Sequence, residues 1–325
     1  MPDAPDDGSG GVSRLPLVEL HRHLEGSVRS STILEIARRE GHHLATAPRP
    51  RDLLVADDSL DGLLPYLDRV DVAASAFTRE DDWVRAAREV VLDAYDEGLD
   101  VLELRFSPWF VSSQTGLAPE AVVDAVTEGV RLALELVQLR VGLIGILLRD
   151  LGPDAAGAQL ATVLARRDQF CAIDIAGNEA GFAAELFAPA YARAREAGLH
   201  LTAHAGEGAG PESVWAAVRH LGVERVGHGA RSVEDPRLVD HLAEHGTTLE
   251  LCITSNVQTR AAASFETHPV RVLHERGVPV TLNTDNPRVS GVTLAQEHET
   301  ARLRTGLSDA QLAAIAHQAL TSTFA

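Results

Sequence analysis

The sequence contains no lysine, so all 29 residues counted as lysine or arginine are arginine. This absence excludes Schiff-base chemistry on a lysine, a phosphate-binding loop that depends on lysine, and a carboxylated lysine that bridges two metal ions. A metal site in this chain must therefore be built from other side chains.

Cysteine is almost as scarce, with only Cys171 and Cys252 present. Two cysteines exclude a disulfide framework and a four-cysteine zinc site. The zinc deaminases that use a Pro-Cys-x-x-Cys ligand pair are excluded too, because the chain has no such pair. Both cysteines lie in apolar runs and are expected to be buried thiols. We expect a cytoplasmic location, and a metal site here must use His, Asp and Glu.

Long apolar runs and a basic surface are also missing. No segment approaches the length of a membrane span, and the formal net charge is −18. A strongly acidic chain is poorly suited to bind a phosphate backbone, so we expect neither a membrane nor a nucleic acid as partner. Residues 1–14 are expected to form a disordered acidic tail, without the features of a secretory signal. Residues 15–325 are expected to form one domain, acting on a small molecule as a monomer or a homodimer.

Short β-branched and apolar runs alternate with amphipathic stretches along the chain. Eight strands, each followed by a helix, predict a parallel (β/α)₈ barrel, the TIM-barrel architecture. An open doubly wound sheet is less well supported, because no glycine-rich phosphate fingerprint follows the first strand. The expected strands are 17–23, 101–106, 141–148, 171–176, 199–204, 225–228, 248–254 and 279–284.

The connections between these strands read as helices. The expected helices include 83–95, 119–136, 180–197, 212–221, 236–244 and 269–276, and several of them are followed by glycine. The stretch of about 32–77 is too long for one crossover. It predicts two or three extra helices over the C-terminal mouth of the barrel, with an apolar face formed by Leu63, Leu64, Tyr66 and Leu67. This insertion is expected either to pack on the rim or to cover the substrate as a lid.

Polar residues gather at the ends of the expected strands, where barrel enzymes place their catalytic groups. His21 and His23 are two residues apart on a strand, so both side chains point the same way. His204 and Asp285 end two further strands. Three imidazoles and one carboxylate form a donor set suited to zinc with one position left for water, although iron or manganese takes similar ligands.

Two more polar residues follow the same pattern. Glu207 is a candidate for the catalytic cavity, or otherwise a solvated carboxylate before the next helix. His228, between two glycines, is a candidate catalytic group or otherwise a hydrogen-bonded core histidine. The other histidines are interpreted as surface or helix residues: His42, His43, His200, His220, His241, His245, His268, His274, His298 and His317.

Six segments carry a resemblance to the adenosine/adenine deaminase family of the metal-dependent hydrolase superfamily. They occur in the family's order, and each lies at a strand end: ELHRHLEG at 19–26, DIAGNEAG at 174–181, TAHAGE at 202–207, RVGHG at 225–229, ELCITSN at 250–256 and LNTDN at 282–286. The resemblance implies that His21, His23, His204 and Asp285 bind one zinc ion.

The resemblance also implies roles around the substrate. It makes Glu207 the donor to purine N1, His228 and Asp285 the catalytic groups that handle the attacking water, and Gly177 a backbone contact to purine N3. His23, Glu25 and Asn286 complete the expected substrate-binding residues. Asn286 stands where many members have aspartate, and an amide donates a hydrogen bond to purine N7 at any pH. Glu25 stands where many adenosine deaminases have aspartate near the ribose, which resembles adenine deaminases and several bacterial members.

The function predicted from the sequence is zinc-dependent hydrolysis of adenosine or deoxyadenosine to inosine and ammonia. The alternatives are deamination of free adenine or of a modified nucleoside such as aminodeoxyfutalosine, and hydrolysis of a ring amide or ester. A protein that has kept the fold for binding and lost turnover is a further alternative. It is disfavoured because every expected ligand and the proton donor are present.

Overall fold

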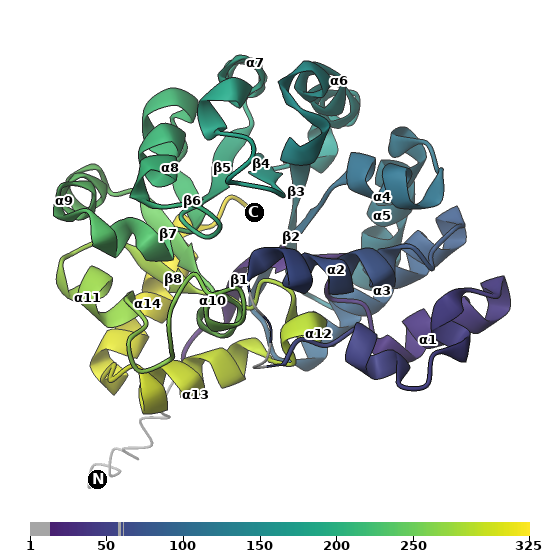
Figure 1. Ribbon diagram of the computed structural model, residues 1–325, viewed down its shortest axis with the longest axis horizontal. Coiled ribbons are helices and arrows are strands. Elements are labelled where there is room, and N and C mark those ends of the chain that lie inside the picture. Colours follow the sequence, from purple (N-terminus) through teal and green to yellow (C-terminus); the bar gives the residue numbers. More distant parts are fainter. Residues whose placement is uncertain (1–13, 58–59, 61) are drawn as a thin grey trace, which may run out of the picture.

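The computed structural model describes residues 14–57, 60 and 62–325, and the chain folds into a ring of strands surrounded by helices (Figure 1). Eight parallel strands pair in chain order: β1 Val18–His23, β2 Val101–Phe106, β3 Arg140–Leu148, β4 Ala172–Ala176, β5 His200–Ala205, β6 Arg225–His228, β7 Thr248–Leu251 and β8 Val280–Leu282. A bridge between Arg22 and Asp285 joins the last strand to the first. The predicted (β/α)₈ barrel is confirmed.

The helices cover the outside of the ring. They are α1 Ser30–Glu40, α2 Leu63–Ala74, α3 Glu80–Asp96, α4 Pro108–Thr115, α5 Pro119–Leu134, α6 Pro153–Leu164, α7 Ala188–Glu196, α8 Pro211–Ala216, α9 Pro236–His245, α10 Ile253–Gln258, α11 Val270–Glu275, α12 Pro287–Ser290, α13 Leu294–Arg304 and α14 Asp309–Ser322. Many begin with proline, whose fixed φ and missing N–H suit the first turn. No helix within the described ranges is long and apolar enough to cross a membrane.

Two predicted elements end or begin elsewhere. The strand predicted at 248–254 ends at Leu251, because the backbone N–H of Thr254 donates to the buried carboxylate of Glu297 (3.0 Å) and helix α10 begins at Ile253. The helix predicted from residue 180 begins only at Ala188 as α7. Before it, the side chain of Asn178 accepts from the backbone of Gly181 (2.9 Å) and holds a turn.

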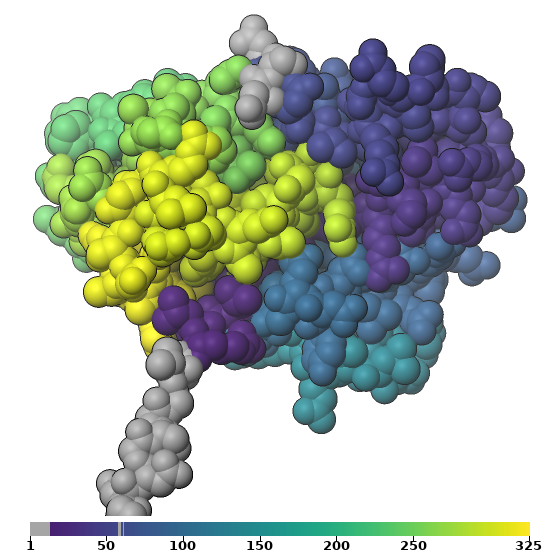
Figure 2. Space-filling view, turned by 90° about the horizontal axis from the view of Figure 1, so that it is seen from below, coloured from purple at the N-terminus to yellow at the C-terminus, as the bar shows by residue number. Residues whose placement is uncertain are grey.

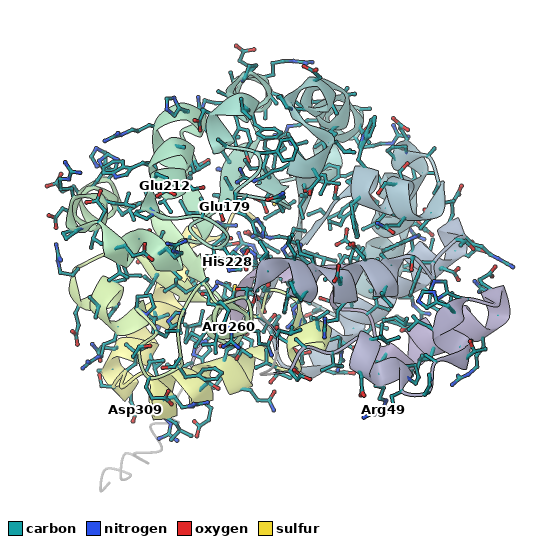
Figure 3. All side chains as sticks on the ribbon, in the orientation of Figure 1. Arg49, Glu179, Glu212, His228, Arg260 and Asp309 are labelled. Carbon is teal, nitrogen blue, oxygen red and sulfur yellow. The ribbon has the colours of Figure 1, made fainter. Side chains whose placement is uncertain are left out.

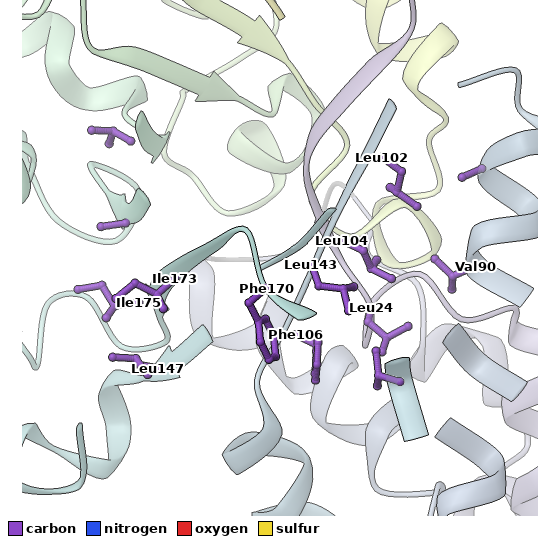
Figure 4. Close-up of a cluster of buried hydrophobic side chains, with 14 of the residues drawn as sticks. Leu24, Val90, Leu102, Leu104, Phe106, Leu143, Leu147, Phe170, Ile173 and Ile175 are labelled. Atoms are coloured by element: carbon purple, nitrogen blue, oxygen red, sulfur yellow. The ribbon is translucent and has the colours of Figure 1, made fainter. Parts of the chain in front are cut away.

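The apolar core lies between the strands and the surrounding helices. Strand β2 turns Leu102, Leu104 and Phe106 toward the helices, where Figure 4 shows them among other buried leucines, isoleucines and Phe170. Its alternate residues, Glu103 and Arg105, are also fully buried and belong to ion pairs with residues of other strands. The barrel interior is therefore a network of charged groups, and the apolar core is the layer outside it.

The long stretch between β1 and β2 divides into two parts. Helix α1 packs beside α3, where the hydroxyl of Thr32 donates to Glu89 (2.6 Å). Helix α2 instead runs across the face of the ring (Figure 1), and Leu67 and Val70 line the cavities there. Helix α2 is thus the part of the insertion that bounds the site.

The two ends of the described chain lie near each other. Ala319 of α14 packs with Val18 and Leu20 of β1, and Figure 2 shows the yellow C-terminal helices beside the purple start of the chain. Of the predicted acidic tail, residues 1–13 lie outside the described residues. Arg14 donates to the backbone oxygen of Gly98 (3.1 Å).

Candidate metal centre and active site

The four predicted metal ligands meet at the end of the barrel where the strands finish. His21 and His23 come from β1, His204 from β5, and Asp285 from the turn after β8. The Nε2 atom of His204 lies 3.1 Å from the Nε2 atoms of both His21 and His23. Oδ1 of Asp285 lies 3.6 Å and 3.3 Å from those same two nitrogens. One small volume is thus surrounded by three imidazole nitrogens and a carboxylate oxygen.

Carboxylates behind the rings turn these nitrogens toward one another. Nδ1 of His21 lies 2.7 Å from Glu250, and Nδ1 of His204 lies 2.9 Å from Asp174. An ionised carboxylate only accepts hydrogen bonds, so both Nδ1 atoms carry the proton and both Nε2 atoms carry a lone pair. Facing lone pairs at 3.1 Å repel unless a cation lies between them. A tetrahedral centre with bonds of about 2.0–2.1 Å separates its ligands by about 3.3 Å, so this set fits such a metal.

Arginines keep the supporting carboxylates ionised. Arg105 donates to both Asp174 and Glu250 (2.8 Å each), and Arg225 donates to Glu250 (2.6 Å). Burial alone would raise the pKa of Glu250, but the two guanidinium groups hold it well below its usual value. The arginines inside the barrel therefore stabilise the ionised carboxylates that orient the histidines of the ligand cluster.

Glu207 and His228 lie on the same small pocket as the ligand cluster. The pocket encloses about 60 Å³, and its wall includes His204, Glu207, His228, Asp285 and Asn286. Burial, followed by the nearby carboxylates of Asp285 and Glu179, raises the pKa of Glu207 well above its usual value. A raised pKa favours the protonated form of a carboxyl group, which is the form that can donate a proton.

Backbone strain marks two of the residues that line the pocket. Among the described residues other than glycine, His228 and Asp285 are two of three with positive φ, at 60° and 62°. This left-handed conformation is costly for residues with a Cβ atom and tends to persist where function requires it. At each of these residues it lets the backbone turn sharply at a strand end, so that the side chain points into the pocket.

A wider cavity of about 490 Å³ shares part of its wall with the small pocket, in the size range of sites for small molecules. His23 and Gly177 line both spaces. Gly177 has a φ of 105°, and a Cβ atom there would lie 2.0 Å from the Asp150 carboxylate. Only glycine fits this position, which leaves its backbone open to the cavity. The predicted contact with purine N3 stays a prediction.

Two other predicted substrate residues are held by neighbours. Oε1 of Glu25 accepts from the backbone N–H of Ser107 (2.9 Å), and burial raises the pKa of Glu25 to about 7. The amide of Asn286 donates one N–H to Oδ1 of Asp285 (2.8 Å), which leaves its second N–H as a donor. Glu25 lines the wider cavity and Asn286 the small pocket.

The structure also brings in residues to which the sequence analysis gave no role. Glu179 accepts hydrogen bonds from four consecutive backbone N–H groups, at residues 206–209, with distances of 2.6, 3.1, 2.6 and 3.2 Å. Figure 3 shows Glu179 and His228 near the centre of the barrel face. Glu179 belongs to a segment that resembles the family, and an acidic residue that follows a strand end was the available signal.

The prediction that His268 is a surface or helix residue is wrong, because only 4% of it is exposed. It lies just before α11, and its ring approaches the buried side chain of Asn256. The sequence carries no signal for this contact beyond the His-Pro pair that precedes a helix, since the two residues meet only in the folded chain.

The loop that carries Glu207 should depend on the charge of Glu179. In Glu179→Gln, an amide nitrogen replaces one acceptor and faces backbone donors. Hydrogen bonds to a charged group contribute about 1.5–3 kcal/mol, so we expect a lower melting temperature and a clear fall in turnover. Thermal unfolding and kcat measure the two effects. The matched control is Glu185→Gln, at an exposed residue nearby. Equal behaviour of the two variants would contradict this role of Glu179.

Comparison with known proteins agrees with this geometry. The family model described as "Adenosine deaminase" matches residues 16–325. The adenosine deaminase of Edwardsiella ictaluri is 40% identical, with 96% of this chain and 94% of the relative covered. That of Klebsiella pneumoniae is 43% identical, with the same coverage.

Solved structures show the same fold. An adenine deaminase from Arthrobacter aurescens superposes with a TM-score of 0.88 at 28% identity, covering 96% of this chain and 94% of that one. An amidohydrolase from Burkholderia ambifaria with bound Zn gives 0.87 at 30%, covering 96% and 86%. Arabidopsis ADAL in complex with IMP gives 0.84 at 29%, covering 96% and 92%. The chain belongs to the adenosine deaminase family.

Proposed function

We propose that this protein hydrolyses the 6-amino group of adenosine or deoxyadenosine and releases inosine, or deoxyinosine, and ammonia. One observation carries the proposal. Three imidazoles and a carboxylate surround one point, and a buried glutamic acid, Glu207, lies on the same pocket. The adenosine deaminases of Edwardsiella ictaluri and Klebsiella pneumoniae are about 40% identical to this chain, which supports adenosine as the substrate.

The metal would be held by His21, His23, His204 and Asp285. We propose one zinc ion per chain, because three nitrogens and one oxygen suit zinc and a solved relative contains Zn. Zinc in such a site supplies Lewis acidity, which lowers the pKa of a coordinated water toward neutrality. Residues of the protein itself donate the proton to the purine, hold the attacking water and orient the ring.

Those side chains act at two places on the purine, the N1 edge and one face at C6. Glu207, protonated because it is buried, donates to ring N1 and makes C6 more electrophilic. On the other face, His228 and Asp285 hold the attacking water. The backbone of Gly177 and the amide of Asn286 orient the ring through N3 and N7. The C6–oxygen bond forms and the C6–nitrogen bond breaks. The proton from Glu207 ends on N1, one water proton leaves with the ammonia, and the other restores the proton of Glu207.

The charge of the wider cavity favours a nucleoside over a nucleotide. Its wall includes four carboxylate side chains, those of Glu25, Asp68, Asp71 and Asp150. Burial, together with Asp68 and Asp150, raises the pKa of Asp71 to about 6, which indicates a negative potential there. None of the described residues that line this cavity is an arginine. A 5′-phosphate would be repelled, so we expect AMP to be a poor substrate.

The experiment that tests the proposal is the loss of absorbance at the adenine band. We would compare kcat/KM for adenosine, deoxyadenosine, adenine, AMP and aminodeoxyfutalosine with the zinc-loaded protein. The proposal expects adenosine or deoxyadenosine to be highest and AMP lowest. Adenine is the second candidate, because a structural neighbour is an adenine deaminase and the buried Glu25 lines the cavity. Highest activity with adenine or AMP would contradict the proposal.

Glu25 should influence the choice between nucleoside and base. In Glu25→Asp the carboxylate retreats by one methylene, loses its bond to Ser107 and changes its distance to a ribose hydroxyl. Because a hydrogen-bonding site loses discrimination when its group is displaced, the ratio of kcat/KM for adenosine and adenine should shift. Glu35→Asp, at an exposed carboxylate, is the control. A ratio that stays unchanged would mean that Glu25 does not contact the sugar.

A further inference from the structure

A chain of hydrogen bonds runs from the backbone of α11 to the ring of His228. The backbone N–H of Val270 donates to Nδ1 of His268 (3.2 Å), and Nε2 of His268 lies 3.2 Å from Oδ1 of Asn256. Nδ2 of Asn256 then lies 2.9 Å from Nδ1 of His228. The three side chains are buried, so water does not compete for these contacts.

The contact between Val270 and His268 determines which atoms donate and which accept in this series of hydrogen bonds. A backbone N–H can only donate, so Nδ1 of His268 is an acceptor and carries no proton. Burial lowers the pKa of His268 to about 3, so the ring is neutral at neutral pH and has one N–H group. That group is Nε2–H, which donates to the amide oxygen of Asn256.

The orientation of the Asn256 amide determines the role of Nδ1 in His228. With its oxygen occupied by His268, Asn256 presents its NH₂ group to His228, and Nδ1 of His228 must accept. A proton on that Nδ1 atom would face the N–H of the amide, which excludes it. The proton of a neutral His228 ring is therefore on Nε2, the nitrogen that lies 3.5 Å from Oε2 of Glu207.

We propose that Asn256 and His268 are positioning residues that hold His228 as the Nε2–H tautomer. In this state His228 donates a hydrogen bond into the pocket and does not remove a proton from water. The identity of the reaction rests on the function proposed above, whereas the tautomer follows from these contacts together with the neutral state of the buried His268 ring. The role of His228 is then to stabilise the oxygen that becomes attached to C6.

The direct test is nuclear magnetic resonance of the zinc-loaded protein labelled with ¹⁵N in histidine. Imidazole ¹⁵N shifts distinguish a protonated nitrogen from an unprotonated one, and loss of a signal set in His228→Gln assigns the ring. We expect His228 to be protonated on Nε2 only. A proton on Nδ1, alone or together with Nε2, would overturn the inference. The result does not depend on turnover, so failure of the proposed function would be seen separately, as absence of adenosine deamination.

A variant tests the positioning role. Asn256→Asp keeps the shape of the side chain but can only accept, so the His228 proton should move to Nδ1, since burial disfavours a second proton on the ring. Loss of a donor to a developing oxyanion lowers kcat by about 10²–10³-fold, with bound zinc and KM little changed. Gln258→Glu adds a carboxylate to the same helix at a side chain that donates to the backbone oxygen of Ser290 (3.3 Å), and it should leave the tautomer unchanged. An unaltered tautomer or kcat in Asn256→Asp would contradict the positioning role.

Discussion

Replacing Glu207 by glutamine should lower kcat by about 10²–10⁴-fold, the usual contribution of a general acid. The substitution keeps the size of the side chain and removes the proton that the raised pKa of Glu207 makes available. Because Glu207 is not one of the four proposed metal ligands, the variant should keep its zinc and bind the purine. Steady-state kinetics, metal analysis and binding of the product inosine measure these three properties.

Glu212→Gln is the matched control for this variant. Glu212 follows in the same segment, is exposed, and accepts a hydrogen bond from the backbone of Gly210 (3.0 Å) without facing the pocket. We expect its turnover to stay close to that of the unchanged protein. If Glu207→Gln retained comparable turnover while remaining folded, Glu207 would not be the proton donor and the proposed mechanism would lose its acid.

Removal of the metal should abolish activity, and one equivalent of zinc should restore it. The four proposed ligands come from β1, β5 and the turn after β8, so a bound cation would also relieve the repulsion between their facing lone pairs. Prolonged chelation should therefore lower the melting temperature as well as the turnover, because a ligand that binds the folded state stabilises it. Two tightly bound ions per chain, or full activity without any, would contradict a mononuclear catalytic site.

Substitutions separate ligands from catalytic groups. His21→Ala should lose zinc, since His21 supplies one of the three nitrogens. His228→Ala should retain zinc and lose turnover, because His228 lies on the pocket wall and is assigned to the reacting water. Metal content after dialysis decides the point. Equal loss of zinc from the two variants would show that the division of roles is wrong.

The sequence was informative where a local pattern is enough. Runs of β-branched residues predicted all eight strands, and their spacing predicted the barrel. The four candidate ligands, with Glu207 and His228, could be placed at strand ends because such a barrel brings those ends together. The structure places the ligand atoms of His21, His23, His204 and Asp285 within 4.8 Å of one another. Their roles as ligands stay predictions.

The sequence was uninformative where contacts between distant segments decide. Residues 253–254 look like the end of a strand, yet Glu297 of α13 captures the backbone N–H of Thr254 and a helix begins there. His268 looks like a surface residue, yet it is buried against Asn256. The four backbone donors around Glu179 belong to another loop. None of these pairs has a spacing that a linear pattern could detect.

The most direct measurement is the conversion of adenosine by the zinc-loaded protein in ¹⁸O-labelled water. We predict inosine with one ¹⁸O atom, at C6, and one ammonia for each inosine formed. This outcome requires that water attacks C6 and that the amine leaves, the step assigned to the pocket of Glu207, His228 and Asp285. Adenosine that remains unchanged under these conditions, or inosine without the label, would contradict the account.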